Sequence, residues 1–454
     1  MRTASQQSFR LKDALLQVFY LAGFLVVAGG FMLHLSQFDL SQAQQPDASS
    51  ALSQAVLGSI YVIAALIMIR APIFPQIIVR AWPVFLLPLL ALLSALWAPD
   101  PMLTLRRALA FSGTIIFGLS LATAFDVRDC LRVVLRALAL AVVLSVIWAL
   151  VFPRYGVHQT TDAVGIAEAG AWRGIFNGKN ALGGLIAGPA FAFLLVYGRH
   201  AFETWTLRGL ALAASLACLL MARSGAGYIV ASILAIMGSF LSLAAAQPIK
   251  VRISMLALAG AVALIPIAFG EDIAGMVLEL LNRDASLSGR TTIWTYVLQL
   301  MEGHWTLGYG YYSGFVLLGA KMDEANPGLN FGSTHSGYLD LLVSFGVVGV
   351  CVGVGYLLWL SVIAFGKFMS WKTAIANPAI TFSLCVIAFA ALNNIVESTI
   401  LAPNCIVPML LSISAGMLSR ETIIESAASA RNQLNDPRIQ GQLTKPALGR
   451  GVGH

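Results

Sequence analysis

Charged residues are scarce in this chain. They make up 11% of its 454 residues, whereas hydrophobic residues make up 58% and the mean hydropathy is +0.81. Soluble globular domains carry about 25% charged residues and need less apolar surface than this. The composition therefore excludes a soluble domain and is typical of a helical protein that crosses the membrane several times.

Cysteine and metal-ligand patterns are also scarce. The chain has five cysteines, none of them in the long polar interval of residues 271–334 and no two at metal-ligand spacing. This argues against a disulfide framework and against a cysteine metal site. No zinc-protease, P-loop or dinucleotide-binding pattern occurs in a usable context, and no Asp-x-Asp set offers paired carboxylates to a divalent cation. We expect chemistry without a metal or a cofactor.

Long apolar runs, by contrast, recur along almost the whole chain. Each is long enough to cross roughly 30 Å of hydrocarbon as a helix. We predict an all-α polytopic membrane protein with about 12 transmembrane helices. The runs lie near 14–33, 51–69, 82–97, 108–125, 133–152, 181–198, 208–222, 225–245, 253–270, 337–366, 378–400 and 404–419.

These runs divide the chain into three parts. Residues 1–13 form a basic N-terminus, and no small-residue cleavage site follows the first run, so we interpret that run as an uncleaved span. Residues 14–420 form one integral bundle with two loops, 153–180 and 271–334. Residues 421–454 are polar and contain proline and glycine, so we interpret them as a disordered tail or tether.

The longer loop carries its own patterns. Residues 272–282 and 292–305 each place apolar side chains at helical spacing, which predicts two amphipathic helices. Residues 307–314 (Leu-Gly-Tyr-Gly-Tyr-Tyr-Ser-Gly) are interpreted as a flexible aromatic segment. Aromatic faces of this kind suit either a sugar ring or the membrane interface.

The distribution of cations predicts the orientation. With the N-terminus on the inside, most of the 28 Lys and Arg residues fall on inner segments, whereas most acids fall on outer ones. The positive-inside rule then places both termini in the cytoplasm and the long loop in the periplasm. The same asymmetry explains the net charge of +7 by a preference for anionic lipid and not for nucleic acid.

Four of the cations that remain outside stand in unusual local sequence. Arg173 and Lys179 share the segment Ala-Trp-Arg-Gly-Ile-Phe-Asn-Gly-Lys-Asn, Arg223 follows a span in Met-Ala-Arg-Ser-Gly, and Arg290 opens a helical pattern. An Arg fork holds phosphate oxygens in pairs, and neighbouring glycines allow close approach. A lipid diphosphate would need several such groups on one face. The alternative for each is a side chain that extends toward lipid headgroups.

Two further residues stand at the outer ends of predicted spans. His335 precedes the 337–366 span, and a histidine at the mouth of a membrane helix can act as a general acid or base. The alternative is a structural histidine. Asp340 lies about 140° around the helix from His335, so we expect no direct pair between them. Glu397 near the end of the 378–400 span is either a functional carboxylate or a polar packing residue.

Four motifs in order resemble a known family. They are Gly170–Gly183, Ala222-Arg-Ser-Gly225, Ser288-Gly-Arg290 and Thr334-His-Ser-Gly-Tyr-Leu339. Together they are similar to the O-antigen ligase and Wzy-type polymerase superfamily of bacterial inner-membrane glycosyltransferases. The first motif is nearest the exopolysaccharide production (ExoQ-like) branch, and the resemblance covers roughly residues 160–350.

The resemblance implies a GT-C-like fold in the bacterial inner membrane and a reaction at the periplasmic face. Glycan would pass from an undecaprenyl-diphosphate donor to an acceptor hydroxyl, with inversion and without metal or cofactor. Two arginines would bind the diphosphate, and the histidine would act as general base or orient the acceptor. The implied catalytic residues are His335, Arg290 and Arg223, and the implied substrate-binding residues are Arg173, Lys179, Asn180 and Glu397.

The family leaves the acceptor open. A second lipid-linked repeat would make the protein a polymerase, and lipid A core would make it a ligase; the ExoQ-like first motif favours polymerase. The implied partners are the undecaprenyl-diphosphate-linked glycan, the bilayer, and a chain-length regulator and a flippase of the same pathway. A lipid-linked glycan transporter and a non-catalytic scaffold are the alternatives from other classes. A transporter would place charges near the midplane and often shows internal repeats, neither of which the sequence contains.

Overall fold

The computed structural model describes residues 4–31, 51–162, 166, 168–268, 290–325, 334–370 and 378–434. Over these residues the chain is helical, apart from turns and one isolated bridge between Val157 and Trp172. The α-helices are α1 (Ala4–Val27), α3 (Ala51–Arg70), α4 (Phe74–Ala81), α5 (Leu86–Leu93), α6 (Pro101–Ala124), α7 (Val127–Val151), α8 (Pro153–Gly156), α9 (Gly188–Tyr197), α10 (Trp205–Met221), α11 (Gly225–Ala245), α12 (Ile249–Ala268), α14 (Arg290–Leu300), α15 (Ser313–Ala325), α16 (Gly337–Met369), α18 (Pro378–Val396) and α19 (Ile406–Leu434).

The all-α polytopic class is confirmed. Every apolar run predicted as a span coincides with one of these helices or with a short series of them. Within the described ranges, nine helices are long and apolar enough to cross a membrane, and Trp205–Met221 is a shorter apolar helix. The count of about 12 spans stays a prediction.

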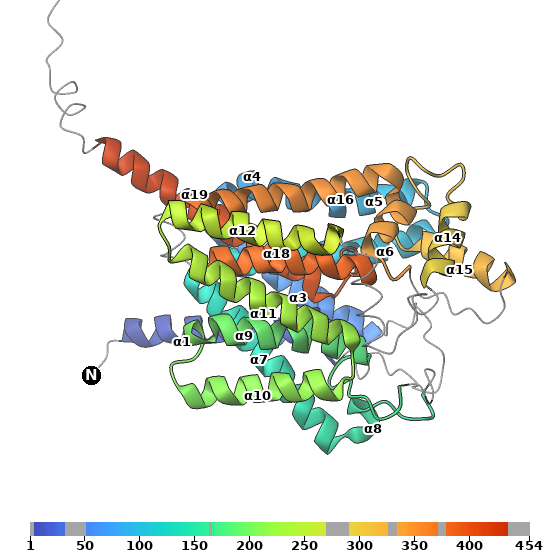
Figure 1. Ribbon diagram of the computed structural model, residues 1–454, viewed down its shortest axis with the longest axis horizontal. Helices are drawn as coiled ribbons and strands as arrows, with labels where there is room; N and C mark the ends of the chain where they lie inside the picture. The colour runs from blue at the N-terminus through green and yellow to red at the C-terminus, as the bar shows by residue number, and fades with distance from the viewer. Residues whose placement is uncertain are drawn as a thin grey trace, which may run out of the picture.

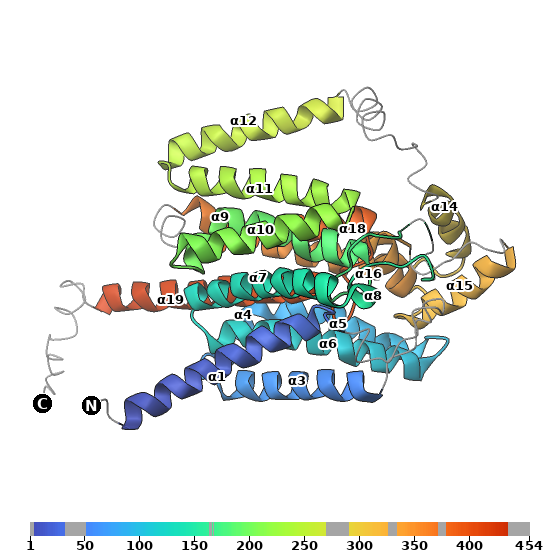
Figure 2. The same cartoon turned by 90° about the horizontal axis from the view of Figure 1, so that it is seen from below.

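The helices run side by side, and the bundle has two distinct ends (Figures 1 and 2). One end carries α8, α14 and α15, and we call it the loop end. The other end carries the start of α1 and the C-terminal part of α19, and we call it the terminal end. The described parts of the two predicted outer loops therefore share one end. The assignment of that end to the periplasm rests on the predicted charge asymmetry.

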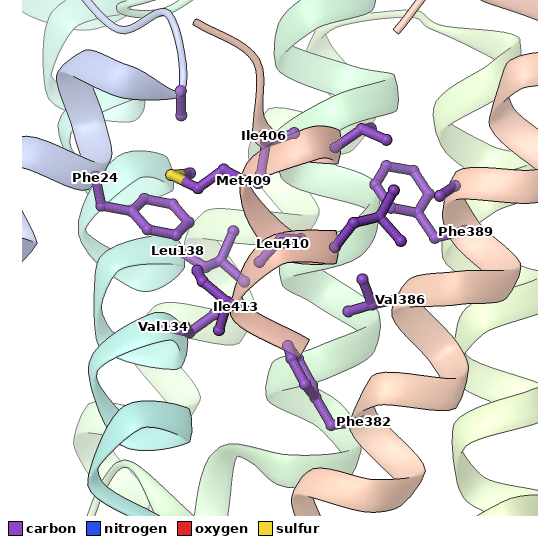
Figure 3. Close-up of a cluster of buried hydrophobic side chains, with 14 of the residues drawn as sticks. Phe24, Val134, Leu138, Phe382, Val386, Phe389, Ile406, Met409, Leu410 and Ile413 are labelled. Atoms are coloured by element: carbon purple, nitrogen blue, oxygen red, sulfur yellow. The ribbon is translucent and has the colours of Figure 1, made fainter. Parts of the chain in front are cut away.

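The core lies between α1, α7, α18 and α19, with α11 and α12 toward one edge of the bundle and α3 toward the other (Figure 2). Figure 3 shows the interdigitated apolar side chains of this core. Between helices in a membrane, such van der Waals packing and not the exclusion of water provides much of the association energy. The labelled core residues, all of them buried, are Phe24, Val134, Leu138, Phe382, Val386, Phe389, Ile406, Met409, Leu410 and Ile413.

The predicted single span at 337–366 is interrupted. Gly346 has φ 63° and ψ −156°, a conformation open to glycine and costly for other residues, and it breaks α16 into two helical parts. The segment at Trp305 to Gly310 runs along the break. Trp305 accepts a hydrogen bond from the Val347 backbone N–H at 2.7 Å, and the Tyr309 N–H donates to the Val343 carbonyl at 2.8 Å. These bonds satisfy backbone groups that the break would otherwise leave unpaired.

The described part of the long loop agrees with one prediction and differs from another. The predicted helix at 292–305 is present as α14, whereas the one at 272–282 lies outside the described residues. Residues 307–314 are not a loose segment, because Tyr311 is buried and donates a hydrogen bond to the Leu401 carbonyl at 2.7 Å. Its backbone N–H is also bonded, to the Ser94 hydroxyl at 3.0 Å. Long-range polar contacts of this kind leave no periodic signal in the sequence.

The first part of the predicted disordered tail is helical. α19 continues through residues 421–434, and Lys367 of α16 pairs with Glu425 at 2.7 Å. Ile423 is partly buried against the core. These contacts hold the helix beyond the apolar run, so residues 421–434 are helical and not disordered, while the domain boundary at 420 stays a prediction. Residues 435–454 lie outside the described part of the chain.

Candidate active site

Two of the predicted site residues meet at the loop end. Arg290, the first residue of α14, lies with its Nη2 at 3.5 Å from Glu397 Oε1, just beyond the end of α18. The two side chains are 22% and 19% exposed. The contact is an ion pair at long range and not a short hydrogen bond. Among the described residues, no hydrogen bond occupies the guanidinium, so its donors can serve a ligand.

The segment of His335 is held between these two residues. Trp294, one helical turn after Arg290, donates from its indole Nε1 to the Thr334 carbonyl at 2.8 Å. The Gly337 backbone N–H donates to the Glu397 carbonyl at 3.1 Å. Backbone and side-chain bonds thus join α14, the start of α16 and the end of α18 at one place.

His335 stands in a constrained backbone position. Its φ is 51°, in the left-handed region where histidine is tolerated better than most residues. The neighbours Thr334 and Ser336 are buried, whereas His335 is half-buried. Thr334 Oγ1 lies 2.5 Å from Asp340 Oδ1. Asp340 therefore bonds to the residue beside the histidine and anchors the turn that presents the imidazole.

The end of α18 is fixed by a buried amide. Asn394 Oδ1 accepts hydrogen bonds from the backbone N–H groups of Thr399 at 3.0 Å and Ile400 at 2.8 Å. Its side chain also packs against Gly337, where a Cβ would lie 2.0 Å from Asn394 Oδ1. Glu397 lies inside the turn that Asn394 closes. The requirement for glycine at 337 is therefore steric.

Arg173 is placed differently from Arg290. Its side chain is buried at 2% exposure, and its Nη1 pairs with Asp162 Oδ2 at 2.9 Å. Its Nε donates to the Tyr155 carbonyl at 2.7 Å, and its Nη2 donates to the Arg154 carbonyl at 3.0 Å. With these donors occupied, Arg173 holds the loop together and presents little of its guanidinium to a ligand.

Lys179 belongs to the same loop cluster. Its Nζ lies 3.2 Å from Glu168 Oε1, and its backbone N–H donates to His158 Nε2 at 3.2 Å. His158 Nδ1 faces Asp162 Oδ2 at 3.4 Å. Burial, and then the charge of Arg173, lowers the pKa of His158. The imidazole is therefore neutral at pH 7, which agrees with an Nε2 that accepts a hydrogen bond.

Asn180 and Arg223 are joined through a serine. The Ser224 hydroxyl donates to Asn180 Oδ1 at 3.1 Å and caps the N-terminus of α11. The π-helical turn η4 (Ala181–Ala187) crosses the start of α11 closely, since a Cβ on Gly183 would lie 2.7 Å from that of Ser224. π-helical turns of this kind are frequent at functional sites.

Arg223 itself is exposed and has φ 49°. A Cβ added to Gly170 would lie 3.8 Å from its Nη1, so the guanidinium lies over the first motif. Among the described residues, no carboxylate is within ion-pair distance of Arg223. Its charge is thus available to an anionic ligand.

The residues around Glu397 and the residues around Arg223 lie at the ends of neighbouring helices. α11, which begins after Arg223, packs against α18, which ends at Glu397. Helices in contact are about 10 Å apart, and both of these ends lie at the loop end (Figure 1). The tertiary structure therefore brings all of the predicted site residues to one end of the bundle. It also separates an open group (Arg223, Arg290, His335, Glu397) from Arg173, which its loop encloses at 2% exposure, while Lys179 and Asn180 stand at the edge of that loop.

Sequence reasoning missed several members of these clusters. His158, Asp162 and Glu168 hold Arg173 and Lys179, and Trp294 and Asn394 hold the His335 segment. One signal was available: three titratable side chains fall within one short outer loop. Among the described residues, these and the other His, Cys, Asp and Glu side chains form no group of three that could hold a metal ion.

A family model described as O-Antigen ligase matches residues 210–352. The chain resembles this family. The matched part contains Arg223, Arg290 and His335, the three predicted catalytic residues.

A relative extends the resemblance over most of the chain. The exopolysaccharide production protein ExoQ of Rhizobium meliloti (strain 1021) is 21% identical over 378 residues, which cover 81% of this chain and 83% of that protein. The predicted resemblance to the O-antigen ligase and Wzy-type polymerase superfamily, nearest its ExoQ-like branch, is thereby confirmed.

Proposed function

We propose that this O-antigen ligase-like protein is an inverting, metal-independent polymerase of an exopolysaccharide. It would join oligosaccharide repeats carried on undecaprenyl diphosphate at the periplasmic face of the inner membrane. The resemblance to the O-antigen ligase family supports a glycan-joining, glycosyltransferase-like activity, and the relative named for exopolysaccharide production favours that polymer class.

The observation that carries the proposal is the ion pair of Arg290 and Glu397 beside the backbone segment of His335. The three residues come from elements that are distant in sequence, and the hydrogen bonds of Trp294 and Gly337 join these elements. A guanidinium that is bonded, among the described residues, only through a 3.5 Å ion pair, near the segment of a half-buried histidine, suits a reaction that expels a charged leaving group and removes a proton.

In the proposed reaction the acceptor hydroxyl attacks C1 of the donor sugar. The new bond joins the acceptor oxygen to C1, while the bond from C1 to the phosphate oxygen breaks. The leaving undecaprenyl diphosphate keeps the electron pair, and the hydroxyl proton passes to a ring nitrogen of His335. Arg290 and Arg223 stabilise the negative charge on the diphosphate. One displacement of this kind inverts the configuration at C1.

Glu397 has a positioning role in this proposal. Without substrate it balances the charge of Arg290 at 3.5 Å and keeps the guanidinium beside the His335 segment. The diphosphate carries more negative charge than the Glu397 carboxylate, and two of its oxygens can bind the planar guanidinium at once. It would therefore compete with Glu397 for the N–H donors of Arg290. Arg173, Lys179 and Asn180 position the first motif, and through Ser224 they fix the turn of Arg223.

The products separate the polymerase from the ligase. If the gene is deleted, we expect long polymer to disappear while single lipid-linked repeats persist. Loss of transfer to lipid A core, with long lipid-linked chains still present, would establish the ligase instead. Gel separation of extracted glycans, with mass spectrometry of the lipid-linked fraction, distinguishes the two results. A purified enzyme that requires added Mg²⁺ would contradict the metal-free mechanism.

The transporter and the scaffold make different predictions. A scaffold would tolerate Arg290→Ala and His335→Ala with polymer length and yield unchanged. A transporter would leave lipid-linked repeats on the wrong side of the membrane after deletion, where an enzyme added outside could not reach them. The position of the open group at one end of the bundle and not at mid-depth favours the enzyme.

A further inference from the structure

A second arginine-rich site lies at the terminal end, opposite the candidate active site. A cavity of about 410 Å³ opens between the start of α7 and the segment that follows α9. Among its lining residues, glutamate is the one acidic side chain and arginine is the most frequent. The charged and titratable lining residues are Arg128, Arg132, Arg136, Arg199, His200 and Glu203.

The helix spacing places three of these arginines together. Arg128, Arg132 and Arg136 are four residues apart on α7, so they share one face of the helix. Asp126 caps the same helix by accepting from the Asp129 N–H at 2.8 Å, and it is not among the lining residues of the cavity. Asp129 pairs with Arg132. The lining of the cavity itself therefore holds four arginines and one glutamate.

Two of the guanidinium groups, those of Arg136 and Arg199, are held through their Nε atoms. Arg136 Nε donates to the Ala201 carbonyl at 3.0 Å, and Arg199 Nε lies 3.3 Å from His200 Nε2. Among the described residues, the Nη groups of Arg136 and Arg199 have no hydrogen-bond partner. Each therefore presents its terminal donors to the cavity in the fixed fork that binds phosphate oxygens in pairs.

The surroundings of the cavity indicate its depth in the membrane. Trp205 follows the lining residue Glu203 closely and is 82% exposed, and the Arg208 guanidinium lies 5.1 Å from its ring centroid. An exposed Trp beside an Arg at a helix end is typical of the headgroup level. Leu207 and Leu210 on α10 are exposed, so the surface next to Trp205 is apolar. The cavity therefore opens where lipid phosphates lie.

We propose that this cavity binds the phosphate of an anionic phospholipid in the leaflet at the terminal end. The ligand class follows from the excess of arginine forks, and the lipid source follows from the interfacial Trp and the apolar surface beside it. On the predicted orientation this leaflet is the cytoplasmic one, where anionic lipid attracts basic surfaces. The site is separate from the proposed reaction and does not depend on it.

Native mass spectrometry of the full-length protein in detergent tests the proposal. Phosphatidylglycerol, phosphatidylcholine or inorganic phosphate is added, and bound adducts are counted. We expect retention of phosphatidylglycerol in preference to phosphatidylcholine. The pair Arg136→Gln/Arg199→Gln should weaken this retention by about tenfold or more. The matched pair Arg70→Gln/Lys250→Gln removes two exposed cations outside the cavity and should bind as the wild type does.

Three results would overturn the proposal. The first is equal retention of the two lipids by the wild-type protein. This test needs no variant, so it decides the question even if the double variant fails to fold. The second is unchanged retention in a folded Arg136→Gln/Arg199→Gln protein. The third is equal protection of the wild type from heat by millimolar inorganic phosphate and by phosphatidylglycerol, which would indicate a site for a soluble anion. Retention by Arg136→Lys/Arg199→Lys between the two extremes would support recognition by the arginine fork.

Discussion

Arg173 and Arg290 both stand at the loop end of the bundle, yet the protein occupies their guanidinium groups to different degrees. Arg173 is 2% exposed and donates to a carboxylate and to backbone carbonyls, whereas Arg290 is 22% exposed and meets one carboxylate at 3.5 Å. The first is therefore part of the framework, and the second suits the ligand-binding role proposed for it. Burial and partners, not the presence of arginine in a motif, distinguish a positioning residue from a binding residue.

The largest expected effect tests the structural role of Arg173. Arg173→Met should destabilise the fold by about 3–5 kcal/mol, because it leaves the carboxylate of Asp162 buried without its partner. Thermal unfolding in detergent measures the effect. Removing both charges in Arg173→Met/Asp162→Leu should recover part of the loss. A single variant as stable as the wild type would contradict the framework role.

Replacing Arg290 by methionine should do the opposite of Arg173→Met: it should reduce activity and leave stability almost unchanged. Arg290→Met should lower polymer yield by about 10²–10³-fold, since it removes a charge that stabilises the leaving group, while the unfolding temperature changes little. Polymer synthesis from lipid-linked repeats and thermal unfolding are measured on the same preparation. Arg154→Met, at an exposed arginine of the same end, is the matched control and should retain activity.

A smaller loss, about 10²-fold, is expected from His335→Asn. Asn tolerates the left-handed backbone at φ 51° as histidine does, so the turn should survive while the base is lost. The pH dependence of polymer synthesis in wild type and variant separates the two roles. If the variant keeps its rate and its pH profile, His335 does not act as the base and at most orients the acceptor.

The smallest effect is the change with pH in the stability of the loop that encloses Arg173. Because the folded-state pKa of His158 is lowered by burial, the unfolded chain binds more protons below about pH 6.5. The stability that the neutral imidazole contributes is complete above that pH and falls as the pH drops through the folded-state pKa. His158→Gln can accept the Lys179 N–H without titrating. Wild-type and variant unfolding temperatures should therefore converge between pH 7 and pH 5; parallel curves would contradict this assignment.

Much of the fold could be predicted because a membrane imposes simple rules. Every backbone group must be bonded within a helix, so apolar length alone located the helices. The break of α16 at Gly346 escaped prediction, because its backbone groups are satisfied by Trp305 and its neighbours, far away in the sequence. The helical stretch 421–434 escaped for a similar reason, since the contact of Glu425 with Lys367 is tertiary.

The candidate site could be predicted in part. Local sequence singled out Arg223, Arg290 and His335, which fall inside the matched family region. It did not separate Arg173 from them, because the separation depends on Asp162 and on backbone carbonyls that the loop brings around the guanidinium. It also missed the arginine cavity at the terminal end, where residues of α7 meet the segment after α9 and each arginine alone looks like an ordinary inner-side cation.

The sequence by itself determined the class of the protein, its apolar helices and the residue types that suit a lipid diphosphate, because these depend on composition and local pattern. The tertiary structure alone decided which cations remain available. It brought Arg290 to Glu397 and the His335 turn, and it enclosed Arg173. The physical reason is that a guanidinium acts on a ligand only with donors that the fold has not already used, and the partners that use them come from distant parts of the chain.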